Sequence, residues 1–201
     1  MVRGRFFEEP REGCEMFIQT EETPNPATLK FIPGVDVMPS GTMDFSAPEA
    51  AECSPLAARL FRIDGVERIF LGADFVSVSK ADRCEWHAMK PVILGVIMEH
   101  FTTGQLVIDP AAMDAAPGVD EAPDDEVVQQ IKELLDTRVR PAVAMDGGDI
   151  VFHGFDEGVV YLHMQGACAG CPSSTLTLKM GIENLLRHYI PEVTEVRPVA
   201  V

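Results

Sequence analysis

The chain is divided by one stretch, Asp109-Pro110-Ala111-Ala112-Met113-Asp114-Ala115-Ala116-Pro117-Gly118-Val119-Asp120-Glu121-Ala122-Pro123-Asp124-Asp125. It holds three prolines and many small residues, and it shows no hydrophobic period. Such a segment repels itself and has too little apolar surface to fold alone, which is typical of a linker. Since 201 residues suffice for two small domains, the sequence predicts an extension (1–15), an N-terminal domain (16–108), a linker (109–123) and a C-terminal domain (124–201).

The N-terminal domain is expected to mix strands and helices. Strands are predicted at residues 17–20, 28–32, 66–71 and 75–79, with Gly72-Ala73-Asp74 as a hairpin turn between the last two. Ser54-Pro55 supplies an N-cap and a first helical position for a short helix ending near residue 61. Apolar residues at helical spacing predict a second helix over 89–101, preceded by Trp86 and His87, for which packing is expected.

The C-terminal domain is expected to open with a helix whose apolar stripe runs from Val127 to Val139 and which Pro141 ends. Strands at 149–153 and 159–164 would form a hairpin, and a helix would follow Pro172, with Leu178, Ile182, Leu185 and Tyr189 on one face. A last strand is predicted at 193–196. The predicted fold class is therefore α+β: two small α+β domains joined by an acidic, Pro/Ala-rich linker.

Charge and composition exclude several classes of function. The net charge is −16, from 32 acids and 16 bases, so a main role in binding nucleic acid is not expected. No apolar run approaches the roughly 20 residues that would span a membrane. The first 15 residues lack an apolar core and are rich in Glu, so neither a secretory signal nor a transit peptide is expected. We therefore expect a bacterial cytoplasmic location, with the mitochondrial matrix as the alternative.

Chemistry is concentrated in one pair of cysteines. Cys168 and Cys171 are separated by the small residues Ala169 and Gly170, so both sulfurs can approach one point. Pro172 suits the first turn of a following helix, and the free N–H groups of a helix N-terminus stabilise a thiolate. The pattern therefore predicts a site for anionic sulfur.

Three interpretations of this pair remain open on spacing alone. A dithiol–disulfide redox site also places C-x-x-C at a helix start, but it favours a βαβ approach, whereas a hairpin is predicted here. A structural zinc site needs four ligands, and the chain has no second C-x-x-C; His163 lies in a predicted strand, where a ligand role is not favoured. An iron–sulfur cluster usually takes four thiolates, so two chains would have to share it.

The residues around this pair resemble a known family. Met145-Asp146-Gly147-Gly148-Asp149-Ile150 and Gly166-Ala167-Cys168-Ala169-Gly170-Cys171-Pro172-Ser173-Ser174 are similar to the C-terminal domain of NifU-type scaffold proteins. Residues 17–31 (FIQTEETPNPATLKF) resemble the N-terminal domain of the Nfu proteins. The resemblance implies a [4Fe-4S] carrier, with Cys168 and Cys171 as ligands in a homodimer bridged by the cluster. It also implies upstream cluster-assembly proteins and apo-protein clients as partners.

The remaining candidates are weaker. Cys14 is expected to be a spare thiol, and Cys53 and Cys84 to be ordinary thiols. Asp146 and Asp149, which flank Gly147-Gly148, are expected to form a turn rather than an acid–base or magnesium pair. No pattern of an enzyme stands out, so catalysis is not expected. The alternatives to a carrier are a C-x-x-C thiol–disulfide oxidoreductase and an adaptor whose C-terminal site is structural.

Overall fold

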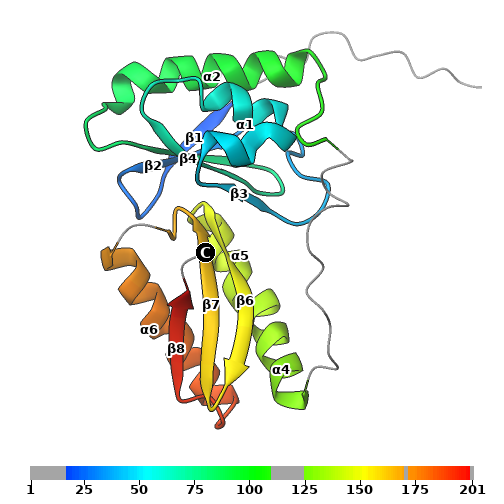
Figure 1. The fold of residues 1–201 in the computed structure, drawn as a ribbon, viewed down its shortest axis with the longest axis vertical. Helices are drawn as coiled ribbons and strands as arrows, with labels where there is room; N and C mark the ends of the chain where they lie inside the picture. The colour runs from blue at the N-terminus through cyan, green and yellow to red at the C-terminus, as the bar shows by residue number, and fades with distance from the viewer. Residues whose placement is uncertain (1–16, 110–124, 170–171, 200–201) are drawn as a thin grey trace, which may run out of the picture.

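A computed structural model describes residues 17–109, 125–169 and 172–199 (Figure 1). The described residues form two α+β units, each with its own core of buried apolar side chains. Cys14, Cys171 and most of the predicted linker lie outside the described residues. No helix in the described ranges is long and apolar enough to cross a membrane.

The N-terminal unit is a five-stranded antiparallel sheet with helices on one face (Figure 1). Its strands, in spatial order, are β1 (Gln19–Glu22), β2 (Thr28–Ile32), β5 (Val76–Lys80), β4 (Val66–Leu71) and β3 (Met43–Phe45). Its helices are the 3-10 helix η1 (Pro48–Cys53), α1 (Pro55–Leu60) and α2 (Trp86–Thr102). The predicted hairpin at Gly72-Ala73-Asp74 is confirmed, whereas β3 and η1 were not predicted.

Sequence-local signals explain both main helices. The Ser54 hydroxyl accepts a hydrogen bond from the Ala57 amide at 3.1 Å, and Pro55 stands at the first helical position of α1, as predicted. The prediction that α2 begins at Met89 is wrong by three residues, because the helix begins at Trp86. The Trp86 indole donates to the Pro26 carbonyl at 3.0 Å and packs against the core, which agrees with a packing role.

Alternation along the strands gives the N-terminal sheet two different faces. Phe31, Ile69 and Val78 belong to the buried core beneath the helices, with Ile93 and Ile97 of α2. The intervening strand residues point to the other face, which no helix of the N-terminal unit covers; we call it the open face. It carries Asp44, Arg68, Phe70 and Ser77, together with Lys30.

The C-terminal unit begins with a nearly continuous helical segment. Its parts are α4 (Glu126–Leu134), a π-helical turn η2 (Leu135–Val139) and α5 (Arg140–Met145). The prediction that Pro141 ends the helix is wrong, because the amide of Arg140 bonds to the Leu135 carbonyl five residues back, and Pro141 lies in the first turn of α5. A widened turn removes the clash between a proline ring and the preceding turn, so the chain continues as a helix.

The sheet of the C-terminal unit has three strands in the order β6 (Gly148–Asp156), β7 (Val159–Gly166) and β8 (Glu195–Val199). β6 and β7 form the predicted hairpin, with a bulge between Phe152 and Gly154. β8 runs parallel to β7, and α6 (Pro172–Tyr189) connects them. Leu178, Ile182, Leu185 and Tyr189 were predicted to share one face of α6. The first three lie in or against the C-terminal core, whereas Tyr189 is 48% exposed.

Candidate functional site

The backbone after β7 holds Cys168 against a glycine turn. Gly166 ends the strand at a φ of 61°, and the amides of Cys168 and Ala169 close turns onto Gln165 (3.3 Å) and Gly166 (3.1 Å). The amide of Ala167 donates to the carbonyl of Gly147 at 3.1 Å. The segment 166–169 is therefore fastened to the turn formed by residues 147–148; we call these two segments together the C-x-x-C end of the domain.

Close packing explains the glycine at position 148. A Cβ atom there would lie 2.7 Å from the Sγ of Cys168 and 2.6 Å from the Gln165 carbonyl oxygen. Both separations are shorter than real side chains tolerate, so only glycine lets the thiol reach this position without a shift of the loop. The motif Met145–Ile150 thus contributes to the site through its backbone.

The Cys168 thiol is buried, with 7% of the residue exposed, and it belongs to the C-terminal core. Burial, followed by the negative charges of Asp146 and Asp149, raises the pKa of Cys168 to about 12. Anionic sulfur was predicted at this loop, whereas burial disfavours the thiolate form of Cys168 in the metal-free chain. A metal at the sulfur would reverse this preference, because a coordinated thiol loses its proton.

The other predicted site residues are placed as follows. Cys171 lies outside the described residues, and α6 begins directly after it at Pro172, as predicted. His163 lies in β7, and its Nδ1 is 3.3 Å from the carbonyl of Val199 in β8, so it is a strand residue. Among the described residues, no three His, Cys, Asp or Glu side chains are grouped to hold a metal ion. Cys53 and Cys84 pack against the N-terminal core.

Asp149, the aspartate that follows the glycine turn, is buried and hydrogen-bonded on several sides. Asp149 is 3% exposed, and its carboxylate accepts two hydrogen bonds from Arg140, at 2.8 and 2.7 Å, and one from the Ile150 amide at 2.8 Å. The hydroxyl of Thr42, from the N-terminal unit, donates a further bond at 2.8 Å. Asp149 is therefore a structural anion. From the sequence, Asp146 and Asp149 were expected only to form a turn. The ion pair of Asp149 with Arg140 was not predicted, because the two residues are nine positions apart.

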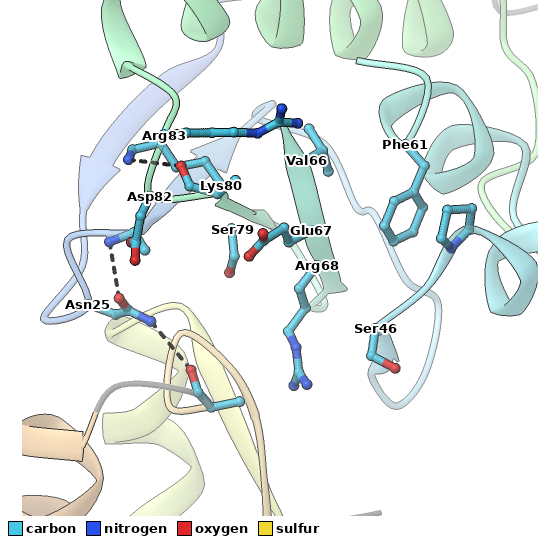
Figure 2. Close-up of a pocket in the computed structure, with 14 residues that line it drawn as sticks. Asn25, Ser46, Phe61, Val66, Glu67, Arg68, Ser79, Lys80, Asp82 and Arg83 are labelled. Carbon is cyan, nitrogen blue, oxygen red and sulfur yellow. Dashed lines mark hydrogen bonds between the residues drawn. The ribbon is translucent and has the colours of Figure 1, made fainter. Parts of the chain in front are cut away.

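The open face of the N-terminal sheet covers the C-x-x-C end. The Asn25 side chain donates to the carbonyl of Ala169 at 3.3 Å (Figure 2), and the Asp44 carboxylate accepts from the Gly166 amide at 3.3 Å. The Ser77 hydroxyl donates to the Gly147 carbonyl at 2.7 Å. Nothing in the sequence indicated these contacts, because they join residues 70 to 144 positions apart.

A groove of about 850 Å³ lies beside this contact. Figure 2 shows its wall on the N-terminal unit, where Arg68, Lys80 and Arg83 lie near Glu67 and Asp82. Ala169, which stands between the two cysteines in the sequence, lines the same groove. The groove therefore joins a surface of mixed charge to the C-x-x-C end.

Comparison with known proteins agrees with the domain order seen here. The family described as "Scaffold protein Nfu/NifU N terminal" matches residues 18–104, and the family described as "NifU-like domain" matches residues 131–197. The two matched regions correspond to the two folded units. The chain belongs to the Nfu/NifU family and carries both of its domains.

Relatives that align with nearly the whole chain are found in flies. Proteins named "NFU1 iron-sulfur cluster scaffold homolog, mitochondrial" from Drosophila virilis and Drosophila willistoni are 54% and 53% identical over 185 residues, or 92% of this chain. The chain spans 62% and 64% of the length of these two proteins. The solution NMR structure of a NifU-like protein from Saccharomyces cerevisiae matches 54% of this chain and 99% of its own, at 24% identity and a TM-score of 0.45, too low to add to the argument.

Proposed function

We propose that this chain is an iron–sulfur cluster carrier in which two copies share one [4Fe-4S] cluster through Cys168 and Cys171. The single observation that carries the proposal is the position of Cys168, which the backbone holds on the Gly147-Gly148 turn, four residues before α6 begins at Pro172 and within the region that matches the NifU-like domain. The relatives' names, which describe iron–sulfur cluster scaffolds, support the same conclusion.

Ligand counting supports a shared cluster. A cluster of this kind usually takes four thiolates, and this loop supplies two. The other described cysteines, Cys53 and Cys84, pack in the N-terminal core, whereas Cys168 packs in the C-terminal core. A second copy of the chain is the simplest source of the two missing thiolates, so the homodimer follows from the chemistry of the site.

In this proposal the cluster is cargo rather than a catalytic cofactor. The chain receives it from cluster-assembly proteins and passes it to apo-proteins, and it catalyses no reaction of its own. A mitochondrial location, the second of the two expected compartments, has the support of the relatives' names, whereas the cytoplasmic expectation has none from them.

A thiol–disulfide oxidoreductase is the competing function, and one observation favours it. The sequence argument against it was that a hairpin, rather than a βαβ unit, leads into the motif. The hairpin of β6 and β7 is present, but β7, α6 and the parallel strand β8 also form a βαβ unit around the motif. A reactive dithiol, however, needs an accessible thiolate, whereas Cys168 is buried and its pKa is raised. The burial of Cys168 therefore counts against the oxidoreductase.

Anaerobic reconstitution with iron and sulfide tests the proposal. We expect brown absorption, about four irons per dimer and a monomer-to-dimer shift in size, on the basis of four thiolates per cluster. Cys168→Ala should abolish all three, whereas Cys84→Ala should retain them. A wild-type chain that stays colourless and monomeric, and that reduces insulin disulfides instead, would overturn the carrier and support the oxidoreductase.

A further inference from the structure

Two aromatic side chains mark the contact between the domains. Phe70 and Phe75 are buried, at 0% and 3% exposed, yet neither belongs to the core of either domain. Phe70 lies on the open face, and its ring is close to Gly166. A Cβ atom added at Gly166 would lie 2.9 Å from the Cγ atom of Phe70. The two rings are 5.8 Å apart, and the Lys30 ammonium lies 4.7 Å from the Phe75 ring centroid. The C-x-x-C end therefore completes the burial of Phe70.

Polar contacts surround this aromatic centre. On the side of the C-terminal domain, they all end in the C-x-x-C end or beside it, at residues 145–149 and 166–169. The bonds from Asn25, Asp44 and Ser77 are joined by one from the Lys30 ammonium to the Met145 carbonyl at 3.2 Å. The contact thus brackets Cys168 on both sides, at Gly166 and at Ala169.

We propose that the open face of the N-terminal sheet is a docking surface for the C-x-x-C end of the same chain, and that this docked domain is a cap that must leave before a second copy can share the cluster. The proposal rests on the carrier function above and adds how access to its site is controlled. In the capped chain, N-terminal atoms bond to the backbone that a second copy has to approach with its own thiolates. Capping and cluster sharing therefore exclude one another.

The character of the contact suits a reversible cap. Among the described residues, four of the five interdomain hydrogen bonds involve backbone groups of the C-terminal domain, at residues 145, 147, 166 and 169, and these groups can bond to water when the domains separate. Interfaces of this polar kind between domains of one chain normally permit relative motion. Each domain keeps its own core when the contact opens, because the core residues of one are not part of the other.

The test uses full-length chains with substitutions only on the open face. Phe70→Glu places a charge against Gly166, and Ser77→Asp places a carboxylate against the Gly147 carbonyl; either variant serves if the other does not fold. Val92→Glu is the matched control, because Val92 is exposed on α2, on the opposite side of the sheet. Small-angle scattering and exchange of the Gly166 amide, which bonds to Asp44 across the contact, report docking in the metal-free chain. Reconstitution with iron and sulfide reports the rate of dimer formation.

We expect the two open-face variants to be more extended than wild type and Val92→Glu, and their Gly166 amide to exchange faster. They should form the brown dimer at least about fivefold faster, which is the lower end of the usual factor by which one binding event changes another. Their iron content should be unchanged. Equal rates, or a wild-type dimer that stays compact and keeps the Gly166 amide protected, would overturn the cap while leaving the carrier intact. Failure of every chain to take up iron would overturn both.

Discussion

Arg140 holds Asp149 in a two-pronged ion pair, with Nε 2.8 Å from Oδ1 and Nη2 2.7 Å from Oδ2. This pair ties α5 to the first residues of β6, so it fixes the glycine turn between them. The carboxylate side chain is 5% exposed and the guanidinium side chain 39% exposed. The carboxylate is therefore far more buried than the guanidinium, so losing the partner should cost Asp149 more than Arg140.

Arg140→Met should destabilise the C-terminal domain, because it leaves a buried carboxylate without its cation. We expect a loss of about 2–3 kcal/mol, less than for a fully buried pair because the guanidinium is partly solvated. Denaturant unfolding followed by circular dichroism measures it. Arg187→Met, which removes a longer pair (3.8 Å) between a 55% exposed guanidinium and Glu183, is the control and should cost at most about 0.5 kcal/mol. Equal losses in the two variants would contradict the structural role of Arg140.

Gly148→Ala should displace Cys168, since the new methyl group would lie 2.7 Å from its Sγ. We expect a loss of about 1–3 kcal/mol, as for other overpacked sites, and weaker iron uptake on reconstitution. Gly181→Ala is the control. Gly181 lies inside α6, and an added Cβ has no atom within 4 Å, so this substitution should stabilise the helix by about 0.5–1 kcal/mol. A Gly148→Ala chain that is as stable as wild type and binds iron equally would show that the loop can move freely.

Ser54→Ala should weaken the N-terminal domain at two points. The buried hydroxyl accepts from the Ala57 amide and donates to the Val107 carbonyl at 2.6 Å, so it caps α1 and ties down the segment after α2. A loss of about 2 kcal/mol is expected from the cap and the unsatisfied carbonyl together. Thr103→Ala removes an exposed hydroxyl that bonds only to carbonyls of α2, and it should have little effect. Thermal unfolding distinguishes the two variants.

His100 should make the N-terminal domain sensitive to acid. Its ring is fully buried, neither nitrogen has a hydrogen-bond partner among the described residues, and burial, followed by the charge of Arg59, lowers its pKa below 6.5. The unfolded chain therefore takes up this proton first. Stability should be full above about pH 6.5 and should fall as the pH drops toward the lowered folded-state pKa.

Replacing the ring identifies the source of this acid sensitivity. His100→Met should flatten the pH dependence of the unfolding midpoint between neutral pH and pH 5, whereas His87→Gln, at an exposed position in the first turn of α2, should leave the slope in place. If His100→Met keeps the full slope, the acid sensitivity arises from other groups.

Local signals predicted most elements and failed where backbone geometry was unusual. Ser54-Pro55, the Gly72-Ala73-Asp74 turn and Pro172 each act within a few residues, so their effects were visible in the sequence. Pro141 misled the prediction because a π-helical turn absorbs it. The short strand β3 carries too few residues to show an alternation. The parallel pairing of β8 with β7 has no local signature, since a whole helix separates the two strands.

By itself the sequence determined two domains with the C-x-x-C pair before a helix, because spacing, capping and alternation are properties of neighbouring residues. Only the tertiary structure decided what surrounds that pair. It buried Cys168 against Gly148, placed Arg140 on Asp149, and laid the open face of the N-terminal sheet over the loop. These contacts join residues far apart in the chain, and their strength depends on burial and on the direction of each donor, which residue order does not encode.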